Sequence, residues 1–121
     1  MIAAIIMGKG VLPPPAPFDM AVLLVAMMVH FGVAIVLAIL FAVLISATDA
    51  GMAGSIIGGA VLGVAVYFVN FYGSTALFPW FAMARGPITL FTHAMFGLVL
   101  GWTYWAIARL GSTRFNAGSI T

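Results

Sequence analysis

Two histidines, His30 and His93, are the side chains of this sequence whose type and surroundings could do chemistry. Counting residues from the expected helix starts places them at similar depths in two apolar segments, within reach of one ligand. Such a pair could supply two axial ligands to haem b or relay a proton, and one histidine alone could bind the magnesium of a (bacterio)chlorophyll. In a simpler interpretation, each imidazole hydrogen-bonds a carbonyl or hydroxyl group, such as that of Thr89 or Thr92, and fixes helix register. We favour the simpler interpretation, so the sequence predicts no cofactor.

No other residue pattern indicates catalysis or metal binding. Cysteine and glutamate are absent, and the two aspartates, Asp19 and Asp49, stand where helices are expected to begin. Helix capping explains both carboxylates, and neither has a partner for acid–base work. Phosphate-binding and nucleophile motifs are also missing. We therefore predict that the protein is not an enzyme.

The composition indicates a membrane protein. Hydrophobic residues make up 65% of the chain and charged residues 5%, and the mean hydropathy is +1.29. Too few polar side chains remain to cover a surface that faces water. The net charge of +2 is too small and too scattered to favour nucleic acid. The lipid bilayer is the expected partner of most of the surface.

The apolar segments predict an all-α integral membrane protein with three transmembrane helices, at residues 20–46, 51–72 and 87–109. Asp19 is expected to cap the first helix, and Thr48 or Asp49 the second. Pro87 suits the first position of the third helix, and Arg109 followed by Gly111 predicts its end. The short turn between the first two spans predicts that they form an antiparallel hairpin.

The remaining segments are expected to lie at the membrane surface. Residues 1–19 read as a frayed or interfacial arm that ends in a proline-rich connector, because three consecutive prolines at 13–15 prevent a helix. Residues 73–86 mix tryptophan, phenylalanine, proline and arginine, which suits an interfacial aromatic loop. Residues 110–121 form a polar tail. Basic residues fall two on each side of the membrane, so the sequence does not assign an orientation.

Small residues recur every four positions in all three spans, and this spacing predicts close helix packing. The second span carries the stripe Gly51, Ser55, Gly59 and Gly63. The first span carries Ala34, Ala38 and Ala42 in the same row as His30, and the third carries Gly97 and Gly101 in the same row as His93. We take these as the helix-packing residues.

The segments MVHFGVAIVLA (residues 28–38), NFYG, FPWFAMARG and THAMFGLVLGWTYWAI (within residues 70–107) resemble a group of small bacterial inner-membrane proteins, some of which carry symporter-like names. The resemblance implies a bacterial multi-pass membrane protein with a histidine near the start of its last span. It implies no activity.

Three helices with short loops leave little room for a soluble catalytic site, and three small-residue faces exceed what one internal contact needs. We therefore expect a non-catalytic accessory subunit of a larger bacterial membrane complex, respiratory or photosynthetic, whose partners are other transmembrane subunits. The alternatives are a haem- or pigment-binding subunit that uses His30 and His93, and a small transporter or channel formed by copies of this chain.

Overall fold

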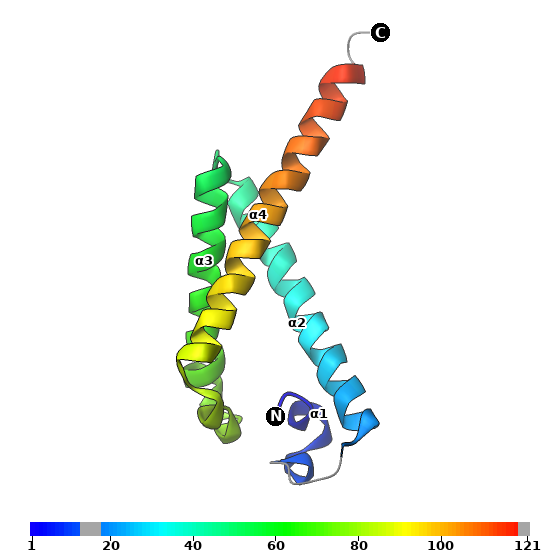
Figure 1. The fold of residues 1–121 in the computed structure, drawn as a ribbon, viewed down its shortest axis with the longest axis vertical. Helices are drawn as coiled ribbons and strands as arrows, with labels where there is room; N and C mark the ends of the chain where they lie inside the picture. Colours follow the sequence, from blue (N-terminus) through cyan, green and yellow to red (C-terminus); the bar gives the residue numbers. More distant parts are fainter. Residues whose placement is uncertain (13–17, 119–121) are drawn as a thin grey trace.

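The computed structural model describes residues 1–12 and 18–118, with side chains to residue 111, and this part of the chain is helical without a strand (Figure 1). The helices are α1 (Ala4–Met7), α2 (Met20–Ser46), α3 (Met52–Phe68) and α4 (Pro87–Gly118). Short helical turns lie at Lys9–Val11, Val69–Gly73, Ser74–Ala76 and Pro79–Ala84. The prolines of the predicted connector at 13–17, and residues 119–121 of the tail, lie outside the described residues.

Three helical segments are long and apolar enough to cross a membrane: Met20–Ser46, Met52–Ala76 and Pro87–Gly111. The predicted all-helical class is confirmed at this level. The first segment has the predicted bounds, and Asp19 caps it as expected, because its Oδ1 accepts hydrogen bonds from the backbone N–H groups of Ala21 (2.8 Å) and Val22 (3.2 Å). The third segment begins at Pro87, also as predicted.

Two predicted helix ends are wrong. Neither Thr48 nor Asp49 caps α3: the capping residue is Gly51, which has no side chain, and the Thr48 hydroxyl donates instead to the carbonyl of Ile45 at 2.8 Å. The second difference is the end of α4, which does not stop at Arg109–Gly111 but continues to Gly118. A glycine stop requires a left-handed backbone, and Gly8 is the one described residue with a positive φ. Gly111 therefore stays helical.

The closely packed helix pair is α3 with α4, whereas α2 diverges from both (Figure 1). α2 and α3 follow one another in antiparallel directions, but the predicted hairpin closes only next to its turn, where Phe41 and Ile45 lie beside Gly58. As a result, α2 exposes isoleucine, leucine and valine over most of its surface, and only Phe41 among its 27 residues is buried.

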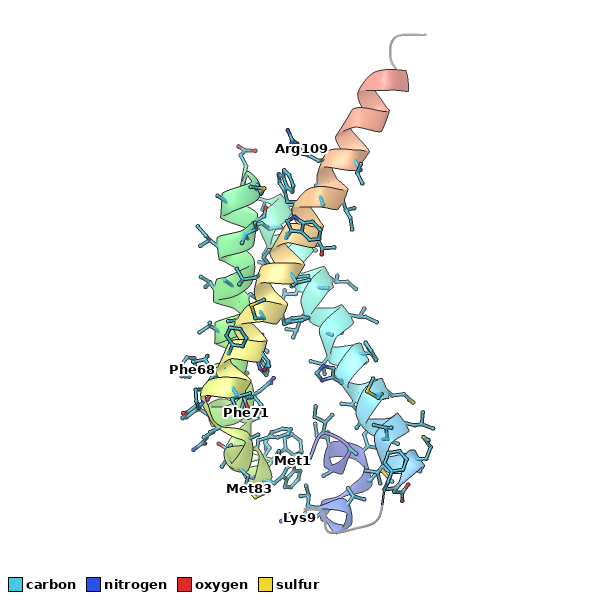
Figure 2. The ribbon with its side chains drawn as sticks, viewed as in Figure 1. Met1, Lys9, Phe68, Phe71, Met83 and Arg109 are labelled. Atoms are coloured by element: carbon cyan, nitrogen blue, oxygen red, sulfur yellow. The ribbon has the colours of Figure 1, made fainter. Side chains whose placement is uncertain are left out.

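α1 is packed into the molecule, so of the two expectations for the arm, frayed or interfacial, the frayed one is wrong. Ala3 and Ala4 are only 1% and 2% exposed. Ile2 contacts an aromatic cluster that we define by Tyr67, Phe71 and Phe81, and Phe78 and Trp80 extend this cluster. Figure 2 shows Met1 and Phe71 at the same end of the molecule, opposite Arg109. The contact of Ile2 with the aromatic cluster therefore anchors the chain just before a short helix that would not form alone.

Candidate functional site

The contact between α3 and α4 is a backbone-to-backbone glycine contact. A methyl group on Gly59 would overlap the carbonyl oxygen of Gly97, and one on Gly63 would overlap the carbonyl oxygen of His93. The relation is mutual, because a methyl group on Gly97 would overlap the carbonyl of Gly59. The two helices are thus as close as two backbones can pack, which is the arrangement that small residues permit.

Ser55 and Gly101 extend this contact toward the start of α3. Ser55 is fully buried, its hydroxyl lies 3.5 Å from the carbonyl of Ala50, and its own carbonyl occupies the space that a Gly101 side chain would need. Of the predicted stripe, Gly51 alone lies outside the contact: it is exposed, and a methyl group there would meet nothing within 4 Å.

The predicted packing residues of α2 do not join the glycine contact. Ala34, Ala38 and Ala42 are half-buried and lie on the diverging helix. Ala34 lines a cavity of about 320 Å³ between α2, α4, α1 and the end of α3. The small-residue face of α2 therefore has no helix of this chain packed closely along it in the described structure.

Both histidines line this cavity, His30 from α2 and His93 from α4. Three further polar side chains face it, those of Asn70, Ser74 and Thr92. The rest of its wall is aliphatic and aromatic, formed by Ile2, Ile5, Val29, Val33, Leu37, Val66, Phe71, Phe78, Phe81 and Phe96. The structure thus brings the two predicted candidate ligands to one apolar cavity with a small polar region.

His93 is held in a fixed orientation. Its Nδ1 lies 2.8 Å from the carbonyl oxygen of Thr89, and its ring meets the rings of Tyr67 and Phe71 edge to face, with centroids 5.8 and 5.4 Å apart. Because a carbonyl can only accept, Nδ1 carries the proton of the neutral imidazole and Nε2 carries the lone pair. This hydrogen bond is the one that the simpler interpretation expected for His93, and it leaves Nε2 able to accept a bond.

His30 is positioned much less firmly. Its side chain is exposed, its ring meets that of Phe31 edge to face at 6.3 Å, and among the described residues none hydrogen-bonds the imidazole. The hydrogen bond expected for His30 is therefore not formed with any described group. The two histidines share the cavity but differ in how rigidly they are held.

Sequence reasoning missed a π-helical turn at Val69–Gly73 and the residue that supports it, Arg85. The Arg85 Nε donates to the carbonyl of Phe71 at 2.6 Å, Nη2 donates to the Thr75 hydroxyl at 3.2 Å, and the guanidinium lies 4.2 Å from the ring centroid of Tyr72. A cation satisfies the carbonyls that a helix end leaves free. The position of Arg85, 14 residues beyond Phe71, gives no local signal of this contact.

Comparisons with protein-family models, curated proteins and solved structures find no match for this chain.

Proposed function

We propose that this chain is a non-catalytic subunit of a larger bacterial inner-membrane complex, with α3 and α4 as its rigid core and α2 as its docking helix. The observation that carries the proposal is the divergence of α2, which leaves its small-residue face without a close helix partner in the described structure. Small residues on a lipid-facing helix forgo the dispersion contacts that a second backbone would provide.

The contrast between α2 and the α3–α4 pair supports this role. In the glycine contact, the small-residue faces of α3 and α4 pack against each other. Ala34, Ala38 and Ala42 have the same four-residue spacing, yet they are only half-buried, and Ala34 lines the cavity. A transmembrane helix of another subunit would pack against this row as α4 packs against α3. The proposed parent complexes are respiratory or photosynthetic assemblies.

Substitution on the two sides of α2 tests the proposal. Ala38→Phe adds volume to the small-residue face, whereas Ile39→Phe changes a side chain that is 60% exposed and lies on another face. We expect wild type and Ile39→Phe to co-purify with larger membrane subunits in a mild detergent, and Ala38→Phe to lose them. The measurement is mass spectrometry of tagged protein isolated from its own membranes.

Two results would contradict the proposal. Recovery of the wild-type chain without any other protein would contradict its membership of a larger complex. Recovery with copies of itself alone would favour the homo-oligomeric transporter or channel. If Ala38→Phe co-purified with the same subunits as wild type, α2 would not be the docking helix.

A further inference from the structure

We propose that the cavity binds the ring of a quinol, an aromatic lipid with ring hydroxyl groups, and that His93, and not His30, is the histidine that accepts a hydrogen bond from it. This inference does not depend on the proposed subunit role, because every group involved belongs to this chain. It concerns binding only.

Around His93, the polar protons of the cavity are committed to the backbone, whereas the Asn70 amide can still both donate and accept. The hydroxyl of Ser74 donates to the carbonyl of Val69 at 3.2 Å, and that of Thr92 donates to the carbonyl of Thr89 at 2.9 Å. Nδ1 of His93 donates to the same Thr89 carbonyl. The protons of these three groups are thus committed to the backbone, while both hydroxyl oxygens and the Nε2 lone pair remain acceptors. A ligand group that donates a hydrogen bond is therefore the matching partner next to His93.

The apolar wall indicates the rest of the ligand. Phe71, Phe78, Phe81 and Phe96 surround the polar region with aromatic rings, which favour contact with another planar ring. Val29, Val33 and Leu37 of α2 supply an aliphatic wall along the diverging helix, where an apolar tail would lie. A hydroxylated ring with an isoprenoid or alkyl tail matches both surfaces.

The geometry favours one anchoring histidine over two axial ligands. His93 belongs to the glycine contact, where its own carbonyl packs against Gly63, whereas His30 is exposed on the helix that diverges. Two axial bonds to one haem iron require both imidazoles to be held in matching positions. The volume of about 320 Å³ is also at the small end of the usual range for ligand sites, roughly 300 to 1,000 Å³, which suits a single ring better than a tetrapyrrole.

The oxidation state of the ligand gives a sharp criterion. A quinol hydroxyl can donate to Nε2 of His93 and can also accept from the Asn70 amide, whereas a quinone carbonyl can only accept and so cannot bond Nε2. We therefore expect the cavity to prefer the reduced form by about tenfold, the effect of one hydrogen bond of ordinary strength.

Equilibrium binding of radiolabelled decylubiquinol to the full chain in lipid nanodiscs tests the proposal, with empty nanodiscs to subtract partitioning into lipid. Wild type should show one saturable site per chain and bind decylubiquinone about tenfold more weakly. His93→Phe keeps an aromatic ring and should lose about tenfold in affinity, whereas His30→Phe should stay within about twofold.

A matched pair on α2 tests the cavity without altering either histidine. Val33 lines the cavity, and Val36 is 64% exposed and does not. Val33→Trp should fill the cavity and abolish saturable binding, and Val36→Trp should bind like wild type. All variants should keep the helical circular dichroism and elution volume of wild type.

The proposal is overturned if wild type shows no saturable site, if quinone binds as well as quinol, or if His93→Phe or Val33→Trp folds normally and binds like wild type. Equal loss in Val36→Trp or His30→Phe would also overturn it. A Soret or chlorophyll band in the purified wild type that disappears in His93→Phe would replace the quinol by a tetrapyrrole. The subunit role would be untouched by any of these results, because it is tested by co-purification.

Discussion

Arg85 connects the end of α3 to the helical turns that lead into α4. Its guanidinium reaches the carbonyl of Phe71 and the face of Tyr72 at once, so a single cation satisfies a helix end and covers an aromatic ring. Nearby, the Tyr67 hydroxyl lies 3.3 Å from the backbone N–H of Gly86, which donates to it. These contacts fix the path of the chain between the two helices of the glycine contact.

Replacement of Arg85 by glutamine should therefore lower the free energy of unfolding by about 1 kcal/mol. This is less than the usual value for a charged hydrogen bond, because Arg85 is exposed and solvent weakens the interaction. Thermal unfolding in detergent measures the effect. Lys9→Gln removes the same charge at an exposed site, so an equal loss in both variants would mean that net charge, and not the Phe71 contact, is responsible.

The unequal anchoring of the two histidines predicts unequal effects on stability. His93→Leu removes the hydrogen bond to Thr89 and should cost about 1 kcal/mol, whereas His30→Leu removes an exposed side chain and should change stability by less than about 0.5 kcal/mol. Parallel unfolding curves of the two variants would check this. A larger loss of stability in His30→Leu than in His93→Leu would contradict the unequal anchoring of the two histidines.

At the scale of the elements, the glycine contact fixes α3 against α4. Gly59 and Gly63 on α3 meet Gly97 and Gly101 on α4 with no side chain between the backbones. Dispersion contacts across such an interface are numerous because the two backbones lie so close. The α3–α4 pair is consequently rigid, and the backbone of His93 is held as part of it.

Even the smallest enlargement should disrupt this interface. Gly59→Ala places a methyl group against the carbonyl of Gly97 and should destabilise the protein by about 2 to 3 kcal/mol. Gly32→Ala is the matched control, since a methyl group there meets nothing within 4 Å and alanine favours a helix. Unfolding by denaturing detergent compares the two. Similar stability of the two variants would contradict the glycine contact.

The sequence predicts local features well and the pairing of helices poorly. The spans follow from continuous apolar stretches, and the Asp19 cap and the bond from His93 to Thr89 join residues four or fewer positions apart, so all three can be predicted from the local sequence. All three spans carry small-residue rows, and nothing local tells which two rows meet. The shared cavity follows from the depth of the histidines, but its aromatic wall depends on the turns at residues 69–84, whose path is fixed by the long-range contact of Arg85.

At the scale of the molecule, the three long helices alternate in direction (Figure 1). The turn between α2 and α3 lies toward the same end as the last turns of α4, and the helical turns at residues 69–84 and α1 lie at the other end. Lys9 and Arg109 stand at opposite ends (Figure 2). Because basic residues stand at both ends, their distribution does not assign the orientation in the membrane. The alternating direction of the helices does predict which loops lie on the same side.

Reporter fusions should follow this alternation. Fusions after Thr48 and after Thr121 should report the same side of the membrane, and a fusion after Thr75 should report the opposite side, because one apolar helix separates each point from the next. Alkaline phosphatase, which is active only outside the cytoplasm, and a fluorescent protein that folds inside it give opposite signals at each point. If segment 73–86 crossed the membrane as a fourth span, Thr48 and Thr121 would report opposite sides. The helical turns there are short, and the segment contains Pro79 and Arg85, both costly in lipid, so we expect the three-span result.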